Sequence, residues 1–327
     1  MSERPKVLLT RVLPAKGMDL LEKHFDLDVN RQDRVMPRGA LKEKIRDKDG
    51  LVCLLTDTID AAIIARALRL KIIANYAVGF NNVDIIEASK RKIPVTNTPD
   101  VLTETTADLT FGLLISIARR ITEAERFMCA GKFEGWAPEL LLGADVHGKV
   151  LGIIGMGRIG RAVARRARGF DMNIVYNDAR RLSGDLEREY GVQYRALSEL
   201  LKESDFVTIH TPLNEETHHL ISDDQFRLMK KTAYLVNAAR GPIVDEKALV
   251  KALREQEIAG CGLDVYENEP SVAAELLQMP NALLVPHIGS ASIETRAKMS
   301  LMVAENIIAV LVKGQRPSNI VNPNIYE

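Results

Sequence analysis

Residues 150–160, VLGIIGMGRIG, carry three glycines in the spacing G-x-G-x-x-G near the middle of a 327-residue chain. The apolar run VLGII predicts a buried strand, and the arginine- and alanine-rich residues after the glycines predict a helix. Glycine is a poor helix former, so three of them at the start of a helix need another explanation. A strand, a glycine turn and a helix in this order are typical of a dinucleotide-binding site.

Each glycine of this turn has its own expected role. Gly155 permits a tight turn, Gly157 leaves room for a pyrophosphate, and Gly160 lets the helix pack closely on the strand. The helix N-terminus then offers free N–H groups and the positive end of its dipole to the phosphates. We expect the cofactor to lie on these glycines and on Arg158 and Ile159 between them.

The choice between NAD and NADP depends on the end of the next predicted strand. Asp178 follows Gly160 by 18 residues (178 − 160), close to the position that binds the adenosine ribose hydroxyls. An acidic side chain there repels a 2′-phosphate and favours NAD, although Asp178 also fits an ordinary turn. Arg180 and Arg181 follow directly and could bind a phosphate, so NADP stays possible.

Composition excludes several classes of protein. Hydrophobic residues make up 46% and charged residues 27% of the chain, as in ordinary globular proteins. Lys plus Arg and Asp plus Glu both number 44, which argues against a nucleic-acid or membrane-surface partner. The three cysteines lie far apart without C-x-x-C, so we expect no disulfide framework and no metal. Without a signal peptide or membrane span, a cytoplasmic enzyme is expected.

Short apolar runs alternate with helical patterns along most of the chain, which predicts parallel sheets covered by helices. The length favours two domains. The strand pattern of the glycine-turn domain is complete by Pro286, so the final helical pattern, residues 292–313, is expected to return to the first domain. We therefore predict a Rossmann-type nucleotide domain, residues 101–286, inserted into a flavodoxin-like substrate domain, residues 1–100 and 287–327.

Three polar residues follow predicted strands of the nucleotide domain. Arg240 comes after AYLVN, Glu269 after GCGLDV and His287 after LLVP. Ligands of open parallel sheets bind at the carboxyl ends of the strands, where these residues should lie. Imidazole titrates near neutral pH, and a carboxylate beside it favours its protonated form. Arginine can bind a carboxylate through two parallel hydrogen bonds. Taken singly, His287 fits a structural histidine, Arg240 a surface arginine and Glu269 a turn residue. Together the three residues indicate catalysis.

Four motifs now carry a more specific resemblance: GIIGMGRIG, LVNAARGPIVDEKAL, GLDVYENEP and PHIGSAS. The chain resembles the D-isomer-specific 2-hydroxyacid dehydrogenase family along essentially its whole length. The resemblance implies that His287 donates and accepts the proton and that Glu269 pairs with it. It implies that Arg240 binds the substrate carboxylate and carbonyl, and that Asp264 holds the nicotinamide amide. Ala238 and His287 are also expected to contact the cofactor.

The resemblance implies further residues around the substrate. The family's substrate loop reads NYAVGFNNVD here, residues 75–84, and the N–H groups of Val78 and Gly79 are expected to receive the carboxylate. A loop that contains glycine can turn consecutive amides toward one anion. Thr106 matches a position near the nicotinamide ribose, with an ordinary helix threonine as the alternative. The cleft between the domains is the expected site of hydride transfer.

Within the family, residues 131–162 are similar to the glyoxylate and hydroxypyruvate reductases. The implied reaction reduces a small 2-oxo acid, with glyoxylate or hydroxypyruvate favoured, to the D-2-hydroxy acid. Trp136 matches a tryptophan that reaches into the partner subunit's substrate pocket, with interface packing as its alternative; a homodimer is expected. Other D-2-hydroxyacid dehydrogenases stay open, and phosphite dehydrogenases are disfavoured by Val78, where they carry a lysine. An NAD-sensing binding protein is the alternative from another class.

Overall fold

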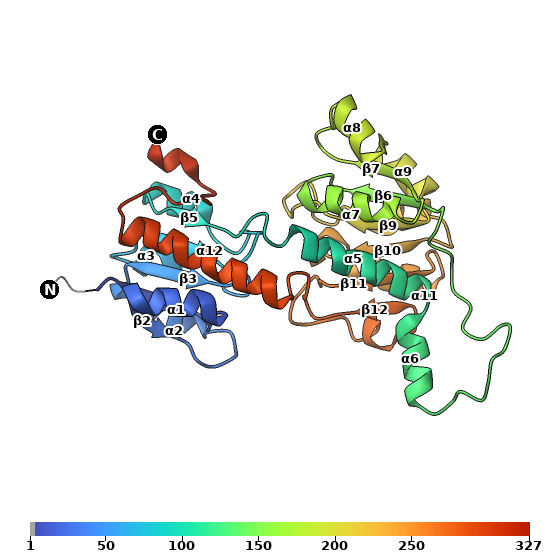
Figure 1. Ribbon diagram of the computed structural model, residues 1–327, viewed down its shortest axis with the longest axis horizontal. Coiled ribbons are helices and arrows are strands. Elements are labelled where there is room, and N and C mark those ends of the chain that lie inside the picture. Colours follow the sequence, from blue (N-terminus) through green and yellow to red (C-terminus); the bar gives the residue numbers. More distant parts are fainter. Residues whose placement is uncertain (1–3) are drawn as a thin grey trace. The chain divides into compact units, whose positions relative to one another are not determined.

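The computed structural model describes residues 4–327 and divides the chain into two compact units (Figure 1). Residues up to Leu102 together with Ser290–Glu327 form the first unit, and Thr103–Gly289 form the second. Each unit has one sheet of parallel strands with helices packed beside it. A parallel sheet buries both of its faces, so its strands read as apolar runs rather than as alternating patterns. The predicted α/β fold class is confirmed.

The first unit contains a five-stranded sheet in the order β2-β1-β3-β4-β5. Its strands are β1 (Lys6–Leu9), β2 (Asp26–Val29), β3 (Gly50–Cys53), β4 (Ile72–Asn75) and β5 (Val95–Thr96). Its helices are α1 (Ala15–His24), α2 (Arg38–Lys44), α3 (Ala61–Arg66), α4 (Ile85–Lys90) and α12 (Ile293–Leu311), with short 3-10 turns at Ile45–Asp47 and Pro323–Tyr326. All residues of β3 and β4 are buried, so the core lies on both sides of these central strands.

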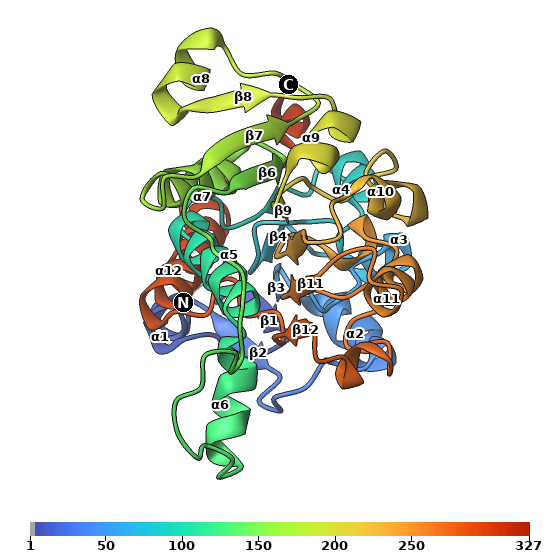
Figure 2. The ribbon, with the colours of Figure 1, turned by 90° about the vertical axis from the view of Figure 1, so that its right-hand side faces the viewer.

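The last helix, α12, belongs to the core of the first unit. It lies beside α1 in both views (Figures 1 and 2), and Val303 and Ile307 pack with Val7 and other apolar residues of the sheet. The two helices approach closely at Gly17, where a Cβ would fall 1.9 Å from Ser300 Oγ. The chain therefore leaves the first unit after Leu102 and returns to it through α12.

The second unit contains a seven-stranded sheet in the order β12-β11-β10-β9-β6-β7-β8. Its strands are β6 (Val150–Ile154), β7 (Asn173–Asn177), β8 (Val192–Tyr194), β9 (Phe206–Ile209), β10 (Tyr234–Asn237), β11 (Gly260–Leu263) and β12 (Ala282–Leu284). The chain runs outward from β6 to β8 and then returns to β9 on the other side of β6. This reversal places a switch point, where open sheets bind ligands, between the carboxyl ends of β6 and β9.

The second unit contains seven helices in the described chain, most of which pack beside its sheet. They are α5 (Thr103–Ala118), α6 (Ile121–Cys129), α7 (Arg158–Arg168), α8 (Gly184–Tyr190), α9 (Leu197–Glu203), α10 (Asp223–Leu228) and α11 (Glu246–Arg254), with 3-10 turns at Gly241–Ile243 and Leu276–Gln278. Across residues 4–327, no helix combines the length and the apolar character that a membrane crossing requires.

The structure divides one helical pattern of the sequence in two. Residues 100–131 have the pattern of one long helix, but the structure breaks it between α5 and α6. Arg120 adopts a left-handed backbone with φ of +53° and forms a two-pronged ion pair with Glu123 in the first turn of α6. The carbonyl of Ala118 accepts a hydrogen bond of 2.8 Å from the N–H of Ala144 in the returning segment. Local contacts at this corner therefore end α5 at Ala118 and turn the chain before α6 begins at Ile121.

Candidate active site

The three glycines of the turn after β6 have three different physical reasons. Gly155 has φ of +94°, and a Cβ there would lie 2.5 Å from the backbone N of Thr211, which follows β9. A Cβ on Gly160 would lie 2.2 Å from the carbonyl oxygen of Gly155, so the first turn of α7 packs directly on the loop. These two glycines are required by the backbone itself.

Gly157 is not explained by packing. Its φ of −72° suits any residue, and a Cβ on it would meet no atom of the described chain within 4 Å. Gly157 is also the N-cap of α7 and provides no side chain to the free N–H groups of the helix. Open space directly before a positively polarised helix end fits the pyrophosphate of a dinucleotide. Arg158 and Ile159 follow, one exposed and one half-buried.

Asp178 lies beside the glycine turn, as its spacing predicts. Its Oδ2 accepts a hydrogen bond of 2.6 Å from the N–H of Met156, and its Oδ1 accepts one of 2.9 Å from the N–H of Arg180. The carboxylate therefore joins the end of β7 to the turn after β6. Arg181 turns to Glu187 instead, with its Nε and Nη2 at 2.9 and 3.1 Å from the two carboxylate oxygens.

Glu269 and His287 come together at the carboxyl ends of β11 and β12. Glu269 Oε2 lies 2.9 Å from His287 Nδ1, and its Oε1 accepts a hydrogen bond of 3.1 Å from the N–H of Tyr266. His287 has a left-handed backbone with φ of +52°, held by a hydrogen bond of 2.9 Å from its N–H to the carbonyl of Asp264. Non-glycine residues in this conformation occur often at functional sites.

Arg240 follows β10 in a turn that Asn237 fixes. The Asn237 side chain donates to the carbonyl of Arg240 at 2.9 Å and accepts from the N–H of Ala239 at 3.0 Å. Arg240 Nη1 donates to the carbonyl of Ala239 at 2.6 Å. Ala238, half-buried, lies between these residues. Asn237 was not among the predicted site residues, although its place at the start of NAAR is a signal that could have identified it.

Arg240 also interacts with Glu269 through its charge. Burial alone would raise the pKa of Glu269, but the hydrogen bond from His287 and the charges of His287 and Arg240 hold it below its ordinary value. Burial lowers the pKa of Arg240, and the charge of Glu269 opposes this shift. The three residues that the sequence predicted are therefore close enough to influence one another, and all three belong to the second unit.

Asp264 and Thr106 lie beside the backbone that follows His287. Asp264 is buried and accepts hydrogen bonds from the N–H groups of Ile288 and Gly289 at 2.6 and 2.8 Å. A Cβ on Gly289 would meet Asp264 Oδ2 at 3.1 Å and Thr106 Cγ2 at 3.5 Å, so Thr106 of α5 lies here too. Burial raises the pKa of Asp264 to about 6, against the two backbone hydrogen bonds and the charge of His287.

The other predicted substrate residues belong to other segments of the chain. Val78 and Gly79 belong to the first unit, where their carbonyls accept hydrogen bonds from the side chains of Asn97 and Asn75 at 2.7 and 2.8 Å. These amides brace the predicted substrate loop. Trp136 follows α6 in the second unit and is 85% exposed. Its predicted role in a partner's pocket therefore needs a second subunit.

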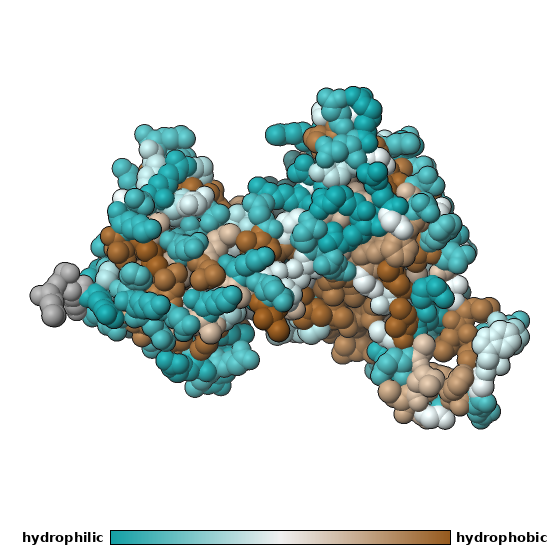
Figure 3. All heavy atoms as spheres, in the orientation of Figure 1, coloured by the Kyte–Doolittle hydropathy of each residue, from teal (hydrophilic) through white to brown (hydrophobic). Residues whose placement is uncertain are grey.

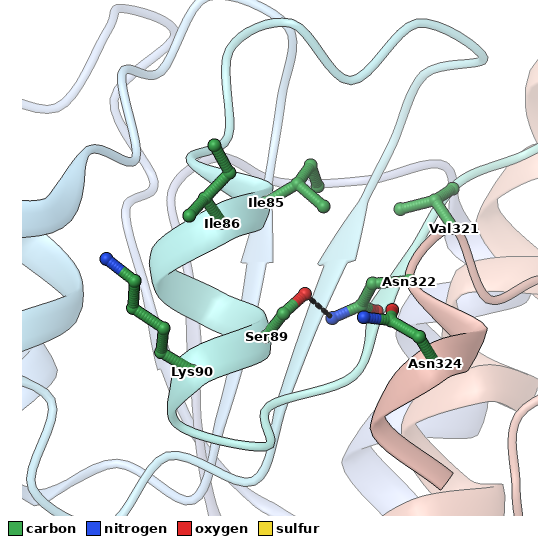
Figure 4. Close-up of a pocket in the computed structure, with 7 residues that line it drawn as sticks. All are labelled: Ile85, Ile86, Ser89, Lys90, Val321, Asn322 and Asn324. Carbon is green, nitrogen blue, oxygen red and sulfur yellow. Dashed lines mark hydrogen bonds between the residues drawn. The ribbon is translucent and has the colours of Figure 1, made fainter. Parts of the chain in front are cut away.

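Two further features of the described chain bring together groups that ligands use. Among residues 4–327, His219, Asp245 and Glu267 bring one potential metal-ligand atom each within 4.8 Å of one another, but these atoms already bind protein groups. In the first unit, a hollow of about 470 Å³ lies between α4 and the C-terminal segment (Figure 4). Its lining holds one charged side chain, Lys90, so it offers no acid–base pair.

Comparison with known proteins agrees with this geometry. Residues 111–289 match the family model described as D-isomer specific 2-hydroxyacid dehydrogenase, NAD binding domain. A glyoxylate reductase of Korarchaeum cryptofilum is 52% identical over 326 residues, which cover 99% of this chain and 98% of that protein. This chain belongs to the D-isomer specific 2-hydroxyacid dehydrogenase family. The predicted family, enzyme class and NAD(P) cofactor are thereby confirmed.

Solved structures of the dehydrogenase family share the fold. A protein from Thermus thermophilus is 44% identical with a TM-score of 0.89, and 97% of this chain covers 99% of it. An NADPH-dependent glyoxylate/hydroxypyruvate reductase from Sinorhizobium meliloti, solved with NADP and malonate, is 33% identical with a TM-score of 0.87 and 98% coverage of both chains. The likeness of this dehydrogenase to both proteins extends over nearly its whole length.

Proposed function

We propose that this dehydrogenase reduces glyoxylate and hydroxypyruvate to the corresponding D-2-hydroxy acids with NADH. The observation that carries the proposal is the contact of 2.9 Å between Glu269 and His287 at the sheet edge that also holds Arg240. The names of the K. cryptofilum and S. meliloti relatives support the choice of substrates. The bound nicotinamide supplies the hydride that reduces the substrate carbonyl carbon.

His287 acts as the acid–base group in this proposal. Its Nδ1 is held by Glu269, so Nε2 is the ring atom that presents a proton to the carbonyl oxygen as negative charge develops there. The Glu269 carboxylate stabilises the imidazolium that donates this proton. Because the backbone of His287 is also fixed by Asp264, the ring keeps one orientation toward the substrate.

Arg240 holds the substrate carboxylate in this proposal. A guanidinium can bind a carboxylate with two parallel hydrogen bonds, and burial strengthens that attraction because less water screens it. The burial that lowers the pKa of Arg240 supports this role. The contribution of the Val78 and Gly79 N–H groups to the same carboxylate stays a prediction from the family resemblance.

NADH is the favoured cofactor because Asp178 borders the glycine turn. A carboxylate at this position accepts hydrogen bonds from ribose hydroxyls and repels a 2′-phosphate. Arg181 would attract that phosphate, but its ion pair with Glu187 already engages it. The positions of Thr106 and Asp264 support their predicted contacts with the nicotinamide half of the cofactor. Ala238 stays a predicted cofactor contact.

We infer that two copies of the protein associate through α6 and the segment after it. Among described residues, α6 buries none of its own, and Met128, Phe133, Trp136 and Leu142 are between 51% and 85% exposed. Figure 3 shows apolar residues gathered on α6 and the segment after it. Contiguous apolar surface of this kind marks interaction sites, and homodimers with two-fold symmetry are the commonest oligomers. A location in the cytoplasm stays a prediction.

Steady-state kinetics test the proposed reaction. NADH oxidation is followed with glyoxylate, hydroxypyruvate and pyruvate and repeated with NADPH, and NAD reduction is followed with phosphite. We expect turnover with the first two acids and its loss in His287→Gln, with NADH binding retained. Tight NADH binding without turnover on any oxo acid would instead support an NAD-sensing protein. Light scattering of wild type and Trp136→Ala tests the dimer, and kinetics of that variant across the oxo acids test the role of Trp136 in substrate selectivity.

A further inference from the structure

The segment that carries Glu269 is held by a single carboxylate that belongs to another element. Glu246, the first residue of α11, accepts a hydrogen bond on Oε2 from the N–H of Glu267 at 3.1 Å and one on Oε1 from the N–H of Ala273 at 2.8 Å. These two donors lie two residues before and four residues after Glu269. Glu246 therefore fixes both ends of the short loop in which Glu269 lies.

The contact between Glu246 and Glu267 is reciprocal. The N–H of Glu246 donates to Glu267 Oε2 at 3.0 Å, while Glu267 donates its own N–H to Glu246. Each side chain therefore accepts the backbone N–H of the other residue and ties the start of α11 to the loop after β11. His219 lies against the same pair, with Nε2 at 3.1 Å from Glu267 Oε1 and Nδ1 at 3.9 Å from Asp245 Oδ2.

The same elements fix Arg240 relative to the loop. Gly241 follows Arg240, and a Cβ on Gly241 would fall 1.8 Å from the carbonyl oxygen of Tyr266. The two backbones therefore touch, with no side chain between them. Tyr266 in turn donates its N–H to Glu269 Oε1. The start of α11, the turn after β10 and the loop after β11 thus form one hydrogen-bonded cluster behind the catalytic groups.

We propose that Glu246 is a positioning residue of the reaction: it fixes the loop so that Glu269 meets His287 Nδ1. Glu267 and His219 support it. The inference rests on the proposed function, because it takes Glu269 to be the group that orients His287. Its physical basis is the steep dependence of catalysis on geometry, since a displacement of about 1 Å can lower a rate about a hundredfold. Glu246 acts through the backbone of the loop, because its side chain accepts from the N–H groups of Glu267 and Ala273.

The test compares Glu246→Ala and Glu246→Gln with a matched control, Glu255→Gln. Glu255 follows the same helix at its exposed end. Glutamine has one acceptor oxygen for two converging N–H donors, so Glu246→Gln keeps one bond and Glu246→Ala keeps neither. The variants are compared for kcat, KM for glyoxylate, NADH affinity, the pH profile of kcat/KM and the folded fraction at the assay temperature.

We expect kcat to fall about tenfold in Glu246→Ala and less in Glu246→Gln, with NADH affinity within about twofold of wild type. The limb of the pH profile that reports loss of the catalytic proton should move toward lower pH, as in Glu269→Gln. The reason is that the displaced Glu269 carboxylate no longer stabilises the His287 imidazolium. A loss of stability alone would not move this limb. Glu255→Gln should match wild type in every measurement.

A second readout does not depend on turnover. The ¹⁵N chemical shifts of the His287 ring, assigned with His287→Gln, report the hydrogen bond at Nδ1. We expect Glu246→Ala to change these shifts in the direction that Glu269→Gln does. Wild-type kcat, pH profile and ring shifts in a folded Glu246→Ala would overturn the proposal. Absence of turnover in the wild type on every oxo acid would overturn the proposed function instead, while the ring shifts would still decide the role of Glu246.

Discussion

The carbonyl oxygen of Gly155 occupies the space beside Gly160, 2.2 Å from where a Cβ on Gly160 would lie. Gly160 must be glycine because of the Gly155 backbone, and Gly155 because of its own φ of +94° and the nearby Thr211 backbone, whereas Gly157 between them faces open space. The motif combines two structural glycines with one whose bare backbone serves a ligand. This difference can be separated by experiment.

Gly157→Ala and Gly160→Ala should fail in different ways. Gly160→Ala forces the helix from the loop and should lower the free energy of unfolding by about 1–3 kcal/mol. Gly157→Ala should change it by about 1 kcal/mol at most, as expected for an N-cap change, yet raise the Kd for NADH at least about tenfold. Urea denaturation and fluorescence titration of NADH measure the two effects. Unaltered NADH binding in Gly157→Ala would contradict the assigned role of this glycine.

Replacing Asp178 should change cofactor choice. Asp178→Ala removes the acceptor for the ribose hydroxyls and the negative charge that repels a 2′-phosphate, so the Kd for NADH should rise about tenfold and that for NADPH should fall. Asp185→Ala on exposed α8 serves as the control, with both affinities unchanged. Titrations with both cofactors give the ratio. A ratio equal to that of wild type would show that Asp178 acts only within the protein, through Met156 and Arg180.

The contact between α1 and α12 should be sensitive to one methyl group. Gly17→Ala places a Cβ 1.9 Å from Ser300 Oγ and 2.4 Å from its carbonyl oxygen, so the helices must separate and unfolding should cost about 1–3 kcal/mol less. Gly39→Ala in α2 meets no described atom within 4 Å and should instead stabilise by about 0.5–1 kcal/mol. Chemical denaturation compares the pair; equal effects would refute the close approach.

Asp264 should make stability depend on pH. Its pKa is raised to about 6 by burial, above the model-peptide value of about 3.9. Between these values the folded state binds more protons than the unfolded state, so this residue lowers stability as pH rises from about 4 to about 6. Asp264→Asn cannot titrate and should lose that dependence. The stability advantage of wild type over the variant should therefore grow as pH falls, which urea denaturation at several pH values measures; a constant difference would exclude the shift.

Much of the second unit was predictable because its strands are buried on both faces. The apolar run VLGII, residues 150–154, coincides with β6, and the arginine- and alanine-rich segment after the glycines forms α7. The short edge strand β8 escaped the pattern, because only one of its three residues is buried. Such strands form because a neighbour offers backbone partners, which a local apolar pattern does not reveal.

Residues at the carboxyl ends of strands were also predictable, since a parallel sheet gathers them at one edge. This logic placed Arg240, Glu269 and His287 correctly relative to β10, β11 and β12. It did not identify Asn237, Glu246 or His219, because their importance lies in hydrogen bonds to backbone groups of distant loops. Nothing in the spacing of these residues along the chain indicates which loop will approach them.

The close packing of α1 against α12 has a consequence for synthesis. Domains usually fold in the order in which they leave the ribosome. Here the unit that contains the first strand lacks part of its core until Ile293–Leu311 has been translated, while the inserted unit is complete at Gly289. The unit whose synthesis begins first is therefore the last to complete its core. The apolar face of its sheet stays exposed until the final helix of the same chain has been translated.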